Sequence, residues 1–189
     1  MRTNLMLAAC LAVLASGCAS TYEPPKDNEA HALLKLKFKY SAVRPGTQLG
    51  ARMHIRHDAK DDGAKFSVAF NEGYGHVQER KSSPEIPMAA VKVHPGKKAD
   101  VRMAVYFYWY TTHTYMVMVG QTPQMRTNQV YHEAACTVQT SFVPEAGKTY
   151  LLDYSSPNVD RDCTANAYEQ VQQGDGKFKL VKVGESKTL

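Results

Sequence analysis

The sequence predicts an all-β protein, a single antiparallel β-sandwich of about seven to nine strands. Short segments in which apolar and polar residues alternate follow one another along the chain, and Gly, Pro, Asn and Asp separate them at even spacing. No long segment shows the apolar period of an amphipathic helix. Evenly spaced strands without intervening helices favour a sandwich or barrel over a sheet with helical crossovers.

The chain is expected to comprise three parts. Residues 1–17 form a leader, residues 18–31 form a short flexible tether with a Pro-Pro pair, and residues 32–189 form the β-sandwich domain. A length of 189 residues suits one domain of ordinary size with a core of its own.

The first predicted strand begins after the tether. Leu34, Leu36, Phe38 and Tyr40 alternate with lysines, which is the period-2 pattern of a strand with one buried and one solvated face. Weaker strand candidates follow at 48–57 and 65–70.

The centre of the sheet is predicted at an aromatic-rich segment. Residues 101–110 read VRMAVYFYWY and are rich in the β-branched and aromatic residues that favour strands. The segment 86–93 leads through a turn at 94–98 into these residues, and a short strand at 114–119 follows them. Residues 120–128, GQTPQMRTN, contain Gly, Pro and Asn and are expected to form a polar loop.

The last third of the chain has the clearest alternation of strands and turns, with strands expected at 131–143, 149–154, 163–171 and 178–183. The phrase SFVPEAGKTY, from Ser141 to Tyr150 and running on to Cys163, resembles a pattern of small envelope lipoproteins with immunoglobulin-like or transthyretin-like sandwiches. The resemblance centres on a Gly-dependent turn into a strand. It implies a fold and no active site.

The leader has the parts of an export signal. Arg2 supplies a positive charge, residues 5–14 form an apolar stretch, and Ala15-Ser16-Gly17 are small residues suited to a cleavage site. The apolar stretch is shorter than the roughly 20 residues that span a bilayer. With Cys18 directly after it, the leader resembles the signal of bacterial lipoproteins, which implies removal of residues 1–17 and lipidation of Cys18.

The same resemblance implies a location. A diacylglyceryl group and an acyl chain such as palmitate on Cys18 would hold the protein stably in a membrane. Ala19 stands where an Asp would favour retention at the inner membrane, so we expect residence in the bacterial outer membrane, facing the periplasm. The alternative is an ordinary secreted protein in which Cys18 is an unmodified residue.

The four cysteines divide by position. Cys10 leaves with the leader and Cys18 is the lipid acceptor, so Cys136 and Cys163 are predicted to form a disulfide in an oxidising compartment. A metal site or a catalytic thiol is the rival interpretation, but no CxxC spacing supports it.

Motifs for catalysis and metal binding are weak. The net charge of +5 is a mild basic excess and does not indicate nucleic-acid binding. His54 and His57 are the closest pair of histidines, but residues three apart on a strand point to opposite faces. No G-x-S-x-G nucleophile motif occurs. We therefore predict no catalytic residue, no metal site and no cofactor.

An aromatic row is the best candidate for a binding surface. Tyr106, Tyr108 and Tyr110 alternate with Phe107 and Trp109, so the two sets are expected on opposite faces of a strand. The tyrosines, with Arg102 and Arg126, could contact an envelope protein or a glycan by stacking and rim charge. The alternative is ordinary sheet surface over a core.

The sequence favours a non-enzymatic envelope lipoprotein that acts as a binding or assembly module. Its partners would be the membrane, through the lipid anchor, and an envelope protein or glycan. The alternative is a periplasmic hydrolase or metal-binding protein that uses histidines such as His54 and His113, brought together by folding. The oligomeric state stays open.

Overall fold

A computed structural model describes residues 21–40, 47–58, 66–76, 89–158, 162–184 and 186–189 of the chain. These residues form ten strands and no helix. The leader, Cys10 and Cys18 lie outside the described residues, so the export signal and lipidation stay predictions.

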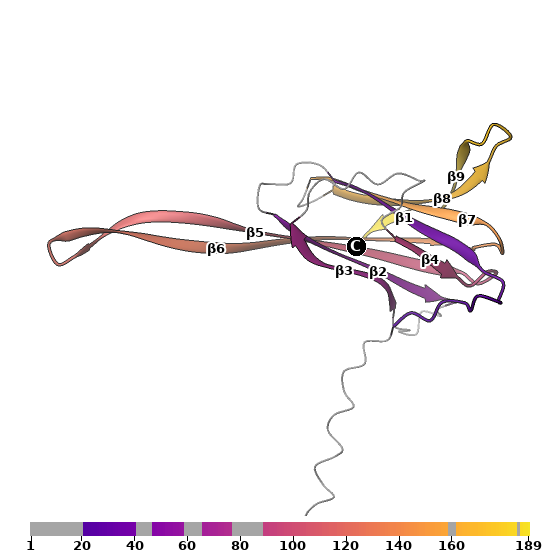
Figure 1. Cartoon of the computed structure of the whole chain (residues 1–189), viewed down its shortest axis with the longest axis horizontal. Coiled ribbons are helices and arrows are strands. Elements are labelled where there is room, and N and C mark those ends of the chain that lie inside the picture. The colour runs from indigo at the N-terminus through magenta and orange to yellow at the C-terminus, as the bar shows by residue number, and fades with distance from the viewer. Residues whose placement is uncertain (1–20, 41–46, 59–65, 77–88, 159–161, 185) are drawn as a thin grey trace, which may run out of the picture.

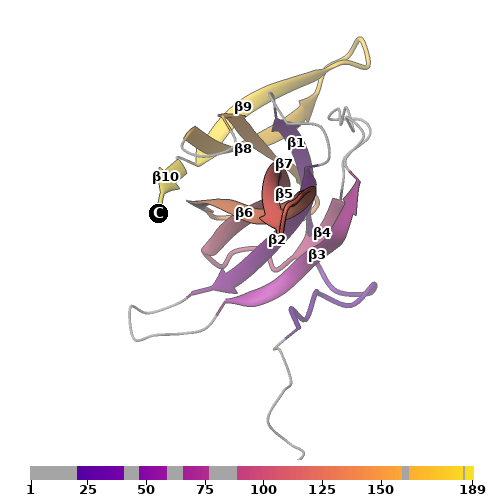
Figure 2. The same cartoon turned by 90° about the vertical axis from the view of Figure 1, so that its left-hand side faces the viewer.

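The strands form two five-stranded sheets that face one another, as predicted for a sandwich (Figure 1, Figure 2). The first sheet has, in order, β4 (Ala89–Val93), β1 (Ala32–Tyr40), β7 (Thr149–Asn158), β8 (Asp162–Gln172) and β9 (Phe178–Gly184). The second sheet has β10 (Ser186–Thr188), β6 (Thr122–Phe142), β5 (Ala99–Val119), β2 (Gln48–His57) and β3 (Ser67–His76).

One strand pair departs from the predicted antiparallel arrangement. β1 pairs with β7 in parallel, with Leu34 beside Tyr150 and Phe38 beside Tyr154, whereas the other pairs are antiparallel. Parallel neighbours need a long crossover, and here the chain passes through the whole of β2 to β6 between the two strands. Local alternation cannot reveal such a pairing.

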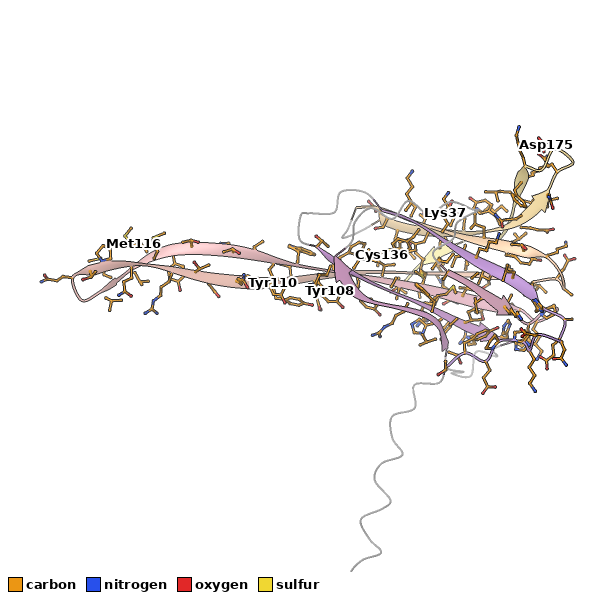
Figure 3. All side chains as sticks on the ribbon, viewed as in Figure 1. Lys37, Tyr108, Tyr110, Met116, Cys136 and Asp175 are labelled. Atoms are coloured by element: carbon orange, nitrogen blue, oxygen red, sulfur yellow. A yellow bond between two sulfur atoms is a disulfide. The ribbon has the colours of Figure 1, made fainter. Side chains whose placement is uncertain are left out.

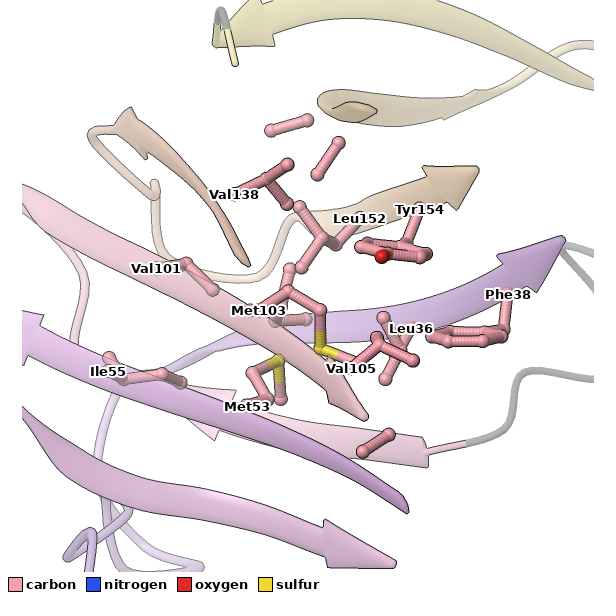
Figure 4. Close-up of a cluster of buried hydrophobic side chains, with 14 of the residues drawn as sticks. Leu36, Phe38, Met53, Ile55, Val101, Met103, Val105, Val138, Leu152 and Tyr154 are labelled. Carbon is pink, nitrogen blue, oxygen red and sulfur yellow. The ribbon is translucent and has the colours of Figure 1, made fainter. Parts of the chain in front are cut away.

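The core lies between the sheets and follows the predicted alternation. Leu34, Leu36 and Phe38 of β1 are buried, and the lysines between them are partly or fully exposed. Met53 of β2 and Met103 of β5 face them from the second sheet (Figure 4). Each fully buried side chain of this size contributes roughly 1.5–3 kcal/mol by leaving water.

The predicted disulfide is confirmed. Cys136 of β6 is bonded to Cys163 of β8, with the two Cα atoms 6.1 Å apart and both residues buried. Because β6 and β8 belong to different sheets, the bond joins the two layers of the sandwich.

A long hairpin projects from the sandwich (Figure 1). β5 and β6 are each 21 residues long and pair without interruption from Ala99 and Phe142 to Val119 and Thr122. β2 accompanies β5 only as far as Tyr108. We call residues 110–131 the arm, because no strand of the described chain pairs with either of its edges.

The polar loop predicted at 120–128 is wrong. A two-residue turn, Gly120-Gln121, connects the strands, and Gly120 has the positive φ of 65° that a type II′ turn requires at its first central position. Pro123 and Asn128, which suggested a loop, lie within β6. Register-matched pairing with β5 outweighs their weak strand propensity.

The predicted tether contacts the sandwich in its described part. Tyr22 is buried and its backbone N–H donates to the carbonyl of Val68, 3.0 Å away. His31 accepts a backbone hydrogen bond from Gly147, and Lys92 forms an ion pair with Asp27. Residues 21–31 therefore lie along the body of the protein.

Candidate functional site

The arm exposes large apolar side chains. Met116, Met118 and Met125 are 63–65% exposed, and Tyr110 is 57% exposed. Figure 3 shows the side chains standing out from both faces of the two-stranded ribbon. Contiguous exposed apolar side chains on a protein surface mark interaction sites more often than scattered ones do.

The three methionines share one face of the arm. Residues alternate between faces along a strand, and directly paired residues lie on the same face. Met116 pairs with Met125, Met118 pairs with Pro123, and Tyr110 pairs with Tyr131. The methionine face therefore has methionines at the tip, tyrosines at the base and threonines between them. Its members are Tyr110, Thr112, Thr114, Met116, Met118, Pro123, Met125, Thr127, Gln129 and Tyr131.

The opposite face of the arm is more polar. It carries Arg126, which is the only Asp, Glu, Lys or Arg residue between positions 110 and 131. At its base the rings of Trp109 and His132 stack, with centroids 5.3 Å apart. The hydroxyl of Thr111 lies within hydrogen-bond distance of Nε2 of His132, at 2.8 Å, and of His113, at 3.4 Å.

The three tyrosines of the predicted surface share one face of β5, as alternation predicts. Phe107, on the other face, is fully buried. Tyr106 and Tyr108 are partly buried, and exposure increases to Tyr110 at the base of the arm. The ring of Tyr131 lies 5.8 Å from that of Tyr108 and 5.5 Å from that of Tyr110, so the row gains a fourth tyrosine from β6.

The two arginines of the predicted surface are not brought together. The guanidinium of Arg102 lies over the ring of Phe66, 4.3 Å from its centroid. Arg126 pairs with Tyr115, and the distance along β5 from position 102 to position 115 is roughly 40 Å at about 3.3 Å per residue. Arg52, which the sequence did not single out, lies over the ring of Tyr106 at 5.6 Å.

A second cluster joins the N-terminal segment to the sandwich. The hydroxyl of Tyr22 lies 3.1 Å from Nε2 of His57, and the rings of His57 and His94 have centroids 5.3 Å apart. Burial lowers the pKa of His57, and the neighbouring His94 lowers it further. Burial raises the pKa of Tyr22 to about 12. The cluster therefore favours two neutral side chains in contact.

The described residues contain no group of three or more His, Cys, Asp or Glu side chains placed to hold a metal ion. They also contain no helix with the length and apolarity to cross a membrane. Comparison of the chain with protein-family models, curated protein sequences and solved structures gave no match.

Two features were not predicted from the sequence. The arm was not predicted because residues 120–128 include residue types that form turns, although the residues that pair with them, 113–119, favour strands. Gly120 lies between Thr114–Val119 and a following segment that could pair with it, and this arrangement was the signal that could have revealed a hairpin. The contact between His57 and His94 depends on how the strands fold together, and no local pattern announces it.

Proposed function

We propose that this protein is a membrane-anchored envelope lipoprotein whose β-sandwich is a non-enzymatic binding or assembly module, with the arm as its interaction surface. The arm is the observation that carries the proposal. No strand of the described chain pairs with the edges of the arm, its methionines are exposed and none of its residues belongs to the core. Such a surface is typical of a docking site.

The lipid anchor rests on the lipoprotein-like signal that ends at Cys18. Thr21 is bridged to Val68 of β3, and Tyr22 is buried. Three residues of extended chain reach at most about 11 Å, so lipids on Cys18 would hold this side of the sandwich close to the membrane surface. Residence in the outer membrane, facing the periplasm, completes the proposal.

The disulfide supports an exported location. Bonds of this kind persist in the periplasm and outside the cell, whereas cytosolic thiols are kept reduced. The sandwich is compatible with the immunoglobulin-like or transthyretin-like type that the 141–163 phrase resembles, and that finer assignment is part of the proposal.

A hydrolase or metal carrier is the competing function. The histidines that folding brings near one another in the described chain are His57 with His94, and His113 with His132 through Thr111. Among the residues that the structure describes, neither pair has a third ligand of the kind that completes a zinc site. The exposed arm therefore favours binding, with an envelope protein as the first candidate partner and a glycan as the second.

The test is chemical crosslinking in intact Gram-negative cells that make the full chain. An arm-shortened variant, in which an Asn-Gly turn joins Tyr110 to Tyr131, serves as the comparison. We expect the full chain to capture a discrete envelope partner that the shortened chain loses. Equal capture by both proteins would overturn the role of the arm, and an unacylated Cys18 peptide in mass spectrometry would overturn the anchor.

A further inference from the structure

We propose that the arm pairs with the arm of a second copy of this chain, antiparallel along the outer edge of β5, and so forms a two-fold dimer. This inference rests on the proposed function, because it names the partner of the same surface. Three observations support it: the β5 edge of the arm has no partner strand in the described chain, this edge has no charged residue, and it can pair with itself in a defined register.

The edge of β5 changes partner at Tyr108. Up to this residue the edge is covered by β2, whose Gln48 pairs with Tyr108. From Tyr110 to Val119 no strand of the described chain pairs with the edge. An open edge presents a row of backbone N–H and C=O groups, and its natural complement is another extended strand.

Charge distinguishes this edge from border strands elsewhere in the described chain. The border strands β4, β9 and β10 carry lysines, which discourage strand addition. These residues are Lys92 of β4, Lys179 and Lys182 of β9, and Lys187 of β10. The β5 edge of the arm carries no Asp, Glu, Lys or Arg from Tyr110 to Val119.

The β6 edge of the arm is protected in two ways. Arg126 places a charge on this strand, and Pro123 has no backbone N–H to donate to a neighbour. The β6 edge of the arm therefore disfavours the addition of a strand, whereas the β5 edge favours it.

A second copy fits the open edge. The edge has no charge with which to attract a charged strand, and none with which to repel its own copy. Antiparallel pairing of one edge with itself is self-complementary, which is the requirement for a two-fold dimer. In the body of each copy β2 lies beside β5, and in the dimer the second arm would extend the sheet along the same side.

A register centred on Thr114 overlaps almost the whole of the two open edges. When residues 110–118 of one copy lie opposite residues 118–110 of the other, Thr114 faces Thr114 of the second copy. Tyr110 then faces Met118 of the second copy, and Thr112 faces Met116 of the second copy. Since these residues have the same parity, they meet on the methionine face, where sulfur–aromatic contacts stabilise the pair.

The register is tested by cysteine substitution in the full chain. Directly opposed residues of antiparallel strands lie about 4.5–5.5 Å apart, which a disulfide can bridge. We expect Thr114→Cys to give a covalent dimer on mild oxidation. The matched control is Thr127→Cys, which pairs with Thr114 within the hairpin but would lie about 14 Å from its counterpart across four strands.

Charge variants test the same contact without oxidation. In the proposed register Thr112→Lys with Met116→Lys places like charges opposite one another twice, and we expect association at least about ten-fold weaker. Thr112→Glu with Met116→Lys in one chain places opposite charges in the same positions and should retain the dimer. The readout is the mass in solution by analytical ultracentrifugation, against 21.0 kDa for one full chain.

The outcomes separate this inference from the proposed function. A monomer, a ring of more than two copies, or a Thr114→Cys chain that crosslinks no better than Thr127→Cys would overturn arm pairing. If the arm nevertheless captures another envelope protein in cells, the proposed function stands with a different partner. If the arm captures neither, both fail.

Discussion

Buried polar side chains decide how this protein responds to pH at the scale of single residues. Folding places His57 against His94 and Tyr22, and it places Asp100 among two cations and a hydroxyl. The pKa values of His57 and Asp100 are both lowered, so folding favours the deprotonated form of each, a neutral imidazole and a charged carboxylate.

Acidification should destabilise the protein through His57. Burial lowers the pKa of this histidine, with His94 adding to the effect, so the unfolded chain binds more protons as the pH falls below about 6.5. Stability is therefore present above that pH and is lost as the pH falls toward the folded-state pKa. Thermal melts between pH 7.5 and pH 5 should show a falling midpoint, less steep in His57→Gln. An identical slope in His57→Gln would contradict this account.

Asp100 should contribute substantially to the free energy of unfolding. The residue is 3% exposed, accepts a hydrogen bond from Ser141 at 2.5 Å, and lies 3.4 Å from Arg56 and 3.3 Å from Lys98. Burial alone would raise its pKa, but the hydrogen bonds from Ser141 and Lys98 bring it below its ordinary value. We expect Asp100→Asn to cost about 1–3 kcal/mol in urea unfolding.

The matched control for Asp100 is Asp153, whose ion pair with Lys37 is more exposed. Asp153→Asn should cost less than about 1 kcal/mol, as exposed pairs usually do. Equal losses at the two positions would show that burial of Asp100 does not matter.

Among the elements, the sandwich and the arm differ in what stabilises them. The core is built from both sheets, which a disulfide joins, whereas no residue of the arm belongs to the core and no strand of the described chain pairs with its outer edges. An isolated two-stranded ribbon is marginally stable in water, so the arm gains order from its continuity with β5 and β6 of the body and from any partner.

Removal of the disulfide should weaken the sandwich. Cys136 and Cys163 are 27 positions apart, and closing a loop of that length stabilises by roughly 3–4 kcal/mol in the chain-entropy model. Cys136→Ala with Cys163→Ala should lower the free energy of unfolding by about this amount. A loss below about 1 kcal/mol would mean that the bond restrains little of the unfolded chain.

Shortening the arm should leave the sandwich intact. With an Asn-Gly turn between Tyr110 and Tyr131, every residue of the buried core is retained. We expect the thermal midpoint to stay within a few degrees of the full chain by calorimetry. A collapse of the midpoint would assign the arm a structural role and weaken its use as a comparison in binding experiments.

For the whole molecule, local sequence patterns predicted the sandwich but did not predict which distant residues pair. Alternation along Leu34, Leu36 and Phe38 identified a buried face correctly, because one strand face must leave water. The separation of Phe107 from Tyr108 followed from the same rule. The parallel β1–β7 pair and the contact of His57 with His94 could not be predicted, since each depends on which distant strands become neighbours.

The candidate site was predicted in part. The tyrosine row was found from composition, but its continuation into an arm was missed because Gly, Pro and Asn were interpreted as a loop. Propensity is a weak guide where a long partner strand fixes the register. The arm gives the molecule a shape with a compact sandwich at one end and an open ribbon at the other (Figure 1).

The proposed function depends on the arm as the surface that contacts a partner. The most direct measurement places a photo-crosslinking amino acid at Met116, at the exposed tip, in the full chain within intact cells, with Asp175 on the β8–β9 turn as the comparison position. We expect a discrete crosslinked product from position 116 and none from position 175. No product from position 116, or the same products from both positions, would contradict it.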